Sequence, residues 1–169
     1  SGFICQSPDI LAPLIYGGTG IESAKQDMPK HSPERFEAGS HSSTAIAGLN
    51  ASLKWLLEIG IDKIHQKEEE NKLRLLEILD RYNNIKTLQP TNQVGLVSCL
   101  FDEYSSDEIG QVLSKYRIAF RSGLHCSPYA HKFLGTFPAG TVRLSVSYFS
   151  NDDEFDMLIR ALDYIRENS

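Results

Sequence analysis

The chain has 169 residues, of which 41% are hydrophobic and 23% charged, and this balance predicts a globular protein that can bury a core. Its formal net charge of -5 and its scattered basic residues argue against nucleic-acid binding. No apolar run reaches membrane-spanning length and the first residues lack the layout of a signal peptide, so we expect no membrane contact and a cytoplasmic location.

The first 45 residues offer little core of their own. Residues 2–5 read as the end of a strand, and residues 8–13 as a turn or a short helical piece. The segment Gly17-Gly18-Thr19-Gly20 is a flexible loop whose backbone either approaches a phosphate or turns a corner. Residues 22–35 contain two prolines and predict an ordered loop. We expect this region to pack against other parts of the protein or against a second subunit.

Residues 35–44 are rich in hydroxyl side chains and precede a long helical pattern. Such side chains suit the N-cap of a helix, because their oxygens accept the free amide donors of the first turn. A hydroxyl-rich helix start is also a natural anion site. Capping alone does not explain the whole polar run, which includes His41. The sequence therefore leaves both interpretations open.

Helical periodicity predicts a helix from Ile46 that ends at Gly60, and a second helix from a cap at Asp62 to about Tyr82. Apolar residues recur on one side of each helix. The expected stripes are Ile46, Leu49, Leu53, Leu56 and Leu57 in the first helix, and Ile64, Leu73, Leu76 and Leu79 in the second.

Shorter elements follow in the rest of the chain. Strands are expected over residues 85–88, 94–101, 117–121 and 141–147, with helices over 107–116 and 129–135 and a final helix that reaches Glu167. Ser105 or Ser106 would cap the 107–116 helix, and Asp152 or Asp153 the final one. In the last strand the alternation turns Val142, Leu144 and Val146 toward the core and Arg143 the other way. This order predicts an α+β fold, a small mixed or antiparallel sheet with helices on one face.

Residues 121–126 bring a histidine and a thiol to the end of a strand. Gly123 permits a sharp turn, which would place His125 and Cys126 on a loop at the sheet edge. Cationic neighbours such as Arg121 raise the thiolate fraction of a cysteine. A single cysteine is otherwise a small buried hydrophobe. The wide spacing of Cys5, Cys99 and Cys126 makes a poor disulfide framework and suits a reducing compartment.

Four ordered motifs resemble class V aminotransferases of the cysteine desulfurase group. They are Gly17-Gly18-Thr19-Gly20, Arg35-Phe36-Glu37-Ala38-Gly39-Ser40, Arg121-Ser122-Gly123-Leu124-His125-Cys126, and Gly140-Thr141-Val142-Arg143-Leu144-Ser145 with the following Tyr148 to Glu154. The resemblance implies a pyridoxal-phosphate enzyme of fold type I, in the α/β family, that forms homodimers with shared active sites. Residues 1–45 would be a piece of the large cofactor-binding domain, and residues 46–169 the small C-terminal domain.

The resemblance also implies roles for individual residues. Cys126 would take sulfur from L-cysteine as a persulfide and pass it to a sulfur-acceptor protein, with His125 holding a proton or orienting the loop. Arg143 would bind the substrate carboxylate, supported by Arg121. Ser40, with its neighbours Gly39 and His41, would reach the cofactor phosphate of the partner subunit.

The lysine that anchors the cofactor lies upstream in that family, so Lys132 is expected to have only a surface role and the chain alone no turnover. Ser40 stands where the family often has threonine, and His41 and Ser42 replace proline and asparagine. Leu124 takes the place of a frequent histidine. Another amino-acid substrate or selenocysteine therefore stays open, as does a non-catalytic interaction or dimerisation domain. No resident metal is expected; a metal site of His125, Cys126 and His131 ranks last, because its spacing does not match a closed zinc pattern.

Overall fold

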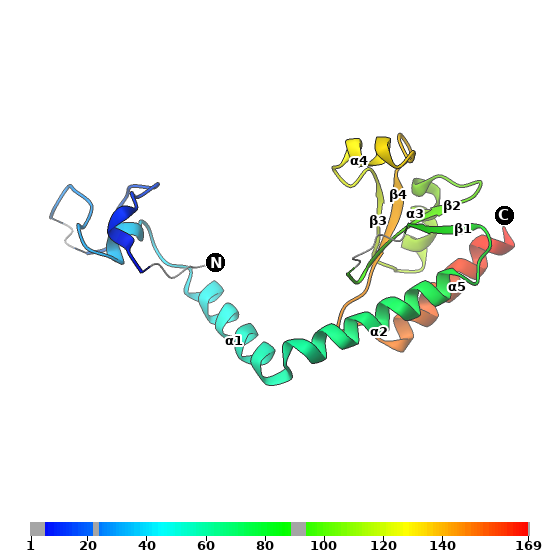
Figure 1. Ribbon diagram of the computed structural model, residues 1–169, viewed down its shortest axis with the longest axis horizontal. Helices are drawn as coiled ribbons and strands as arrows, with labels where there is room; N and C mark the ends of the chain where they lie inside the picture. The colour runs from blue at the N-terminus through cyan, green and yellow to red at the C-terminus, as the bar shows by residue number, and fades with distance from the viewer. Residues whose placement is uncertain (1–5, 22–23, 89–93, 169) are drawn as a thin grey trace. The chain divides into compact units, whose positions relative to one another are not determined.

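The computed structural model describes residues 6–21, 24–88 and 94–168. The chain forms two compact units, Ser1–Leu56 and Leu57–Ser169 (Figure 1). The strand expected over residues 2–5 lies outside the described residues. No helix in the described ranges is long and apolar enough to cross a membrane.

The first unit consists mainly of loops. Its short 3-10 helices are η1 (Pro8–Ile10) and η2 (Glu34–Phe36), and the long helix α1 (Ser43–Ile59) begins in it. The helix predicted from Ile46 to Gly60 is thus confirmed with slightly earlier bounds. Gly60, at φ +90°, ends α1, because this left-handed conformation suits glycine. The apolar stripe of α1 is exposed, and no residue of this helix is buried.

Helix α2 (Ile61–Leu79) opens the second unit. It begins directly after Gly60, which occupies the N-cap position. Asp62 therefore lies in the first turn, and its prediction as the cap is wrong. Leu75, Ile78 and Leu79 are its buried apolar residues, whereas the predicted core residue Leu73 is 56% exposed. The predicted stripe mixed two neighbouring faces of the helix, and the sheet covers only one of them.

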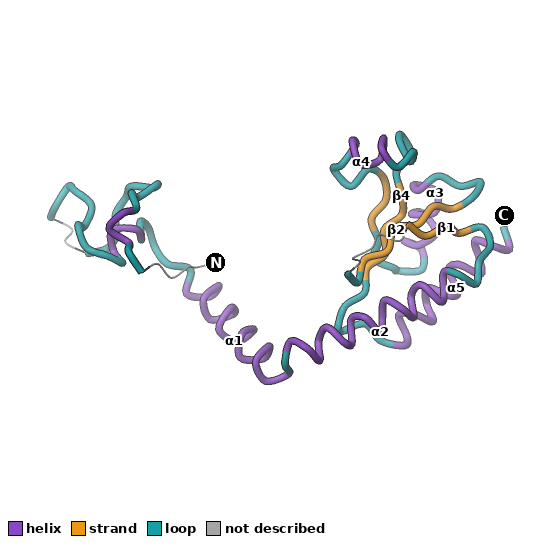
Figure 2. Tube along the Cα trace, viewed as in Figure 1, coloured by secondary structure: helices purple, strands orange, loops and turns teal. Residues whose placement is uncertain are grey.

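The sheet has four strands in the order β1-β2-β4-β3, all antiparallel, which confirms the antiparallel form of the prediction (Figure 2). Their bounds are β1 Ile85–Leu88, β2 Leu96–Phe101, β3 Arg121–Gly123 and β4 Thr141–Ser145. The strand predicted over residues 117–121 is wrong except for its last residue. Arg117 takes φ +57° just after a helix, and the Ile118 amide bonds to the Leu113 carbonyl at 3.0 Å.

One face of the sheet lies in the core. Val97 pairs with Leu144 and Cys99 with Val142, and all four side chains are buried. Helices α2, α3 (Ser106–Lys115) and α5 (Asp152–Glu167) contribute most of the other core residues, as expected for helices packed on one face. Because side chains alternate along a strand, Arg143 lies on the opposite face, as the period-two pattern predicted.

Capping boxes begin the helices α3 and α5. Ser105 caps α3, as predicted, and its side chain accepts the Glu108 amide. Asn151 caps α5, so the prediction of Asp152 or Asp153 is wrong by a residue or two. Asn151 occupies the N-cap position because its side chain accepts a hydrogen bond from the Glu154 amide at 3.2 Å. In return, the Glu154 carboxylate accepts one from the Asn151 amide at 3.1 Å.

Candidate active site

The Cys126 loop follows the edge strand β3, as the sequence predicted. Gly123 ends this strand at φ +92°, and the next turn closes with the Ser127 amide bonded to the Leu124 carbonyl at 2.8 Å. Inside the turn His125 and Cys126 take φ +49° and φ +59°. For residues with a side chain this left-handed conformation costs roughly 1–2 kcal/mol each. Such strain persists only where surrounding contacts impose it, as often happens at functional sites.

Gly140, the residue just before β4, packs against the start of the same loop. A Cβ atom at Gly140 would lie 2.2 Å from the carbonyl carbon and oxygen of Gly123, so only glycine allows this approach. The Gly140 amide donates to the Thr136 carbonyl at 2.7 Å. The backbone before β4 is therefore packed directly against the end of β3. In Figure 1, helix α4 (Pro128–Phe133) lies at this end of the sheet.

The two described cysteines have opposite environments. Cys99 is fully buried in β2, and burial raises the pKa of its thiol to about 12. Cys126 is exposed, and the Arg121 guanidinium donates to its sulfur with an Nη2–Sγ distance of 3.9 Å. A thiolate beside a cation and open to solvent is the reactive form of cysteine. The interpretation as a buried hydrophobe thus applies to Cys99 and not to Cys126.

Arg121 and Arg143 lie directly opposite each other on β3 and β4. They share the sheet face that points away from the core, and Arg143 is partly buried there. Its Nε is buried without a hydrogen-bond partner among the described residues. No carboxylate in that part of the chain forms an ion pair with either guanidinium. Because buried donors are normally bonded, this pair is suited to an anionic ligand.

His125 is close to both arginines and to His131 of α4. Its Nε2 is 3.0 Å from the Thr141 hydroxyl, while its Nδ1 is buried without a partner among the described residues. Burial lowers the pKa of His125, and the nearby Arg143, His131 and Arg121 lower it further. The ring is therefore neutral at neutral pH, and a neutral imidazole can accept a proton.

Acidification is expected to destabilise the second unit through His125. Because the pKa of His125 is lower in the folded chain than in the unfolded one, the unfolded chain binds more protons as the pH falls. The stability contribution is present above the ordinary histidine pKa of about 6.5 and is lost as the pH falls below it. Urea unfolding at several pH values should show a shallower acid loss for His125→Asn, since asparagine tolerates the left-handed backbone. Equal slopes for parent and variant would contradict this assignment.

Sequence reasoning missed the pairing of His131 with Thr136. His131 is only 6% exposed, its Nδ1 is 2.7 Å from the Thr136 hydroxyl, and its ring centroid is 5.6 Å from that of His125.

Within residues 6–21, 24–88 and 94–168 no three His, Cys, Asp or Glu side chains are grouped to hold a metal ion. The neighbouring Lys132 is exposed, and its ammonium lies over the Tyr129 and Phe137 rings.

The glycine-rich loop and the Ser40 segment meet in the first unit. The Gly39 amide donates to the Gly18 carbonyl at 2.7 Å, and Gly39 takes φ +91°. This amide is therefore occupied, whereas the side chains of Ser40 and His41 are exposed. The His41 Nε2 lies 3.3 Å from a Glu37 carboxylate oxygen.

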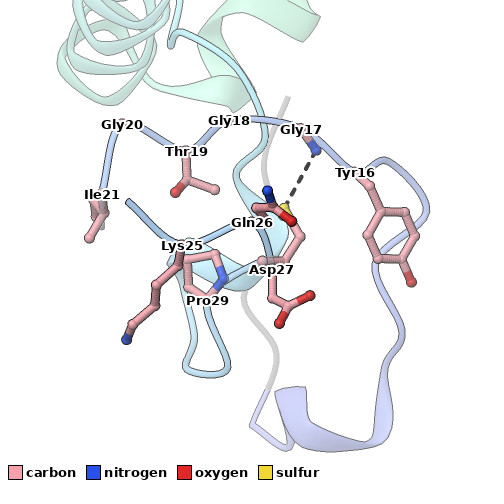
Figure 3. A pocket seen from close by; sticks show the side chains of 11 residues that line it. Tyr16, Gly17, Gly18, Thr19, Gly20, Ile21, Lys25, Gln26, Asp27 and Pro29 are labelled. Atoms are coloured by element: carbon pink, nitrogen blue, oxygen red, sulfur yellow. Dashed lines mark hydrogen bonds between the residues drawn. The ribbon is translucent and has the colours of Figure 1, made fainter. Parts of the chain in front are cut away.

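A cavity of about 610 Å³ adjoins the glycine-rich loop. Residues 16–21 line one side of it and residues 25–29 the other (Figure 3). The Gly17 amide donates to the Met28 sulfur at 3.5 Å across this cavity. These residues and Ser40 belong to the first unit, and Cys126, His125, Arg121 and Arg143 to the second.

Comparison with known proteins gives consistent results. Residues 5–158 match the sequence model of the family "Aminotransferase class-V". A probable cysteine desulfurase 2 of Mycobacterium leprae is 30% identical, over 92% of this chain and 39% of its own length. A probable cysteine desulfurase of Pyrococcus abyssi is 32% identical, again over 92% of this chain and 39% of its own length.

The fold has solved counterparts as well. The apo structure of a cysteine desulfurase from Thermococcus onnurineus superposes with a TM-score of 0.78 at 28% identity, covering 93% of this chain and 40% of that one. A second cysteine desulfurase structure, from Escherichia coli, has a TM-score of 0.76 at 23% identity and covers 92% of this chain and 39% of that one. The chain thus spans about 40% of the length of these relatives.

Proposed function

The chain belongs to the class V aminotransferase family, and on that premise we propose that it supplies the sulfur-accepting cysteine of a pyridoxal-phosphate-dependent cysteine desulfurase. The observation that carries the proposal is the environment of Cys126. Its sulfur is exposed, beside the Arg121 guanidinium, on a strained loop at the sheet edge. These features suit a soft nucleophile that meets a bound substrate and then an acceptor.

In the proposed reaction the Cys126 thiolate attacks the sulfur of bound L-cysteine. A sulfur–sulfur bond forms, the carbon–sulfur bond of the substrate breaks, and its electron pair stays with the carbon, which takes up a proton to give alanine. Cys126 is left as a persulfide. Pyridoxal phosphate, when bound, supplies the electron sink for the bond changes in the amino acid.

Arg143 is proposed to bind the substrate carboxylate. Its buried Nε has no partner among the described residues, and a guanidinium can hold a carboxylate through paired hydrogen bonds. Arg121 lies opposite it and adds positive charge beside both the carboxylate and the Cys126 sulfur. His125, neutral because burial and these arginines lower its pKa, accepts or returns a proton.

The cofactor's phosphate is proposed to meet Ser40 and His41 from the partner subunit of a homodimer. Both side chains are exposed and carry hydrogen-bond donors just before α1, which fits a phosphate group. Gly39 shapes this turn, because its amide is already bonded to Gly18. Lys132 lies over aromatic rings on the surface and is assigned no role in holding the cofactor. We therefore expect no turnover from this chain by itself.

In a longer, cofactor-loaded enzyme that contains this chain, replacing Arg143 with lysine is expected to raise the KM for L-cysteine about 10- to 100-fold, with a smaller change in kcat. Lysine keeps the charge but loses the planar, two-point contact with a carboxylate. Steady-state sulfide assays over a range of L-cysteine concentrations measure both constants. Arg166→Lys, in a surface ion pair with Asp163 on α5, is the control and should leave KM unchanged. A loss confined to kcat would contradict the proposal that Arg143 binds the substrate carboxylate.

The test of the proposed function joins this chain to the part of its longer relatives that it does not match, and supplies pyridoxal phosphate and L-cysteine. We expect sulfide release with reductant and a persulfide on the peptide that contains Cys126. An enzyme that transaminates without releasing sulfide would contradict the proposal. Leu124 stands where the family often has a histidine, so the loop has one acid-base group fewer. Selenocysteine and other amino acids should therefore be tested in parallel. A form that binds no cofactor would support the non-catalytic alternative.

A further inference from the structure

His131 is an unusual residue for its position in α4. Its neighbours Tyr129 and Phe133 are 82% and 91% exposed, so the apolar side chains of this short helix face outward while the histidine is buried. A buried polar ring needs a hydrogen-bond partner. The Thr136 hydroxyl supplies it at 2.7 Å from Nδ1, and the His131 carbonyl accepts the Thr136 amide at 2.9 Å. Both the ring and the backbone of His131 are thereby fixed.

The His131 ring also contacts the ring of His125 in the Cys126 loop. The His131 and His125 ring centroids are 5.6 Å apart, with the ring planes tilted by 47°. From β4, the Thr141 hydroxyl holds Nε2 of His125 at 3.0 Å. The His125 ring is thus contacted from α4 and from β4, and Cys126 is the next residue in the chain.

These contacts provide a physical reason for the conformation of the loop. His125 and Cys126 both have left-handed φ values, which isolated residues of these types avoid. A structural role limited to α4 would require only the bond between His131 and Thr136. The ring contact with His125 extends that bond to the residue beside the nucleophile.

We propose that His131, anchored by Thr136, is a positioning residue that supports the His125 ring and so holds the Cys126 loop in its left-handed conformation. The proposal rests on the proposed function for its meaning in catalysis, but the positioning itself can be measured without turnover. His131 acts through His125 and touches no reacting atom.

The experiment compares His131→Ala, His131→Phe and Thr136→Val with the parent chain. Iodoacetamide alkylation of Cys126 is followed by peptide-resolved mass spectrometry, with the buried Cys99 as internal reference. Hydrogen exchange of the Ser127 amide, bonded to the Leu124 carbonyl, reports the turn itself. Circular dichroism establishes that each variant is folded. The exposed neighbour Lys132 provides the control variant Lys132→Ala.

We expect His131→Ala to speed Ser127 exchange about tenfold and to change the alkylation rate of Cys126 by a similar factor, since a loosened loop samples other conformations. His131→Phe keeps a ring against His125 and should retain most of the parental behaviour, while Thr136→Val should be intermediate and Lys132→Ala unchanged. In the cofactor-loaded longer enzyme, His131→Ala should lower kcat about 10- to 100-fold with little change in KM.

Parental exchange and alkylation in a folded His131→Ala or, should that variant not fold, in Thr136→Val would overturn the proposal, because His131 would then stabilise only α4. Failure of the proposed function gives a different pattern. The longer enzyme would release no sulfide at all, while loop exchange and alkylation would still respond to His131. The two conclusions are therefore tested separately.

Discussion

Replacing Cys126 with alanine is expected to reduce sulfide release from L-cysteine by about three orders of magnitude or more in the cofactor-loaded longer enzyme. The reason is that alanine removes the atom that accepts the sulfur, and the described part of the chain holds no other exposed thiol. Cofactor absorbance and the spectral signs of substrate binding should persist, because Cys126 lies on an exposed loop outside the core. Sulfide assays together with absorbance spectra check both statements.

Cys99→Ala is the matched control for this prediction. Cys99 is buried in β2 and its thiol has a pKa of about 12, so it cannot act as a thiolate near neutral pH. The variant should lose about 1 kcal/mol of stability, as for other small core truncations, and keep its activity. Sulfide release that survives Cys126→Ala, or disappears with Cys99→Ala, would contradict the assignment of the nucleophile.

Local patterns were enough to predict most of the elements in the second unit. The alternation in β4 placed Val142 and Leu144 in the core and Arg143 on the other face, because period two leaves no other arrangement for a one-sided sheet. The strand expected over residues 117–121 failed for a local reason. Arg117 takes φ +57° and the Ile118 amide bonds back to the Leu113 carbonyl, which is a capping arrangement that ends α3 where apolar residues had suggested a strand.

The candidate site divides in the same way. Cys126, Arg121 and Arg143 could be proposed from the sequence because they lie within or beside recognisable motifs. The pairing of His131 with Thr136 could not, since it depends on burial, and the ring contact with His125 has no sequence signal either. The role of Gly140 was hidden too, because the contact that demands glycine is made with the end of a neighbouring strand.

Gly140→Ala is expected to destabilise the second unit by about 3 kcal/mol or more. Two effects add. Alanine would have to adopt φ +74°, and its Cβ would overlap the Gly123 backbone, with contacts of 2.2 Å to a carbonyl carbon and oxygen. Backbone atoms cannot rotate away as a side chain can, so β3 and β4 must separate locally. Urea unfolding should show a lower midpoint with an unchanged slope.

Gly135→Ala separates the two effects, because Gly135 has nearly the same conformation, φ +71°, with no atom within 4 Å of the position that the alanine methyl group would take. It should cost only about 1 kcal/mol, the penalty for a left-handed alanine. The difference between the variants then measures the close approach of Gly140 to Gly123. Since Gly123 begins the Cys126 loop, Gly140→Ala should also alter Cys126 alkylation, while Gly135→Ala should not. Equal stability losses in the two variants would mean that β3 and β4 are not packed closely enough to require glycine at this position.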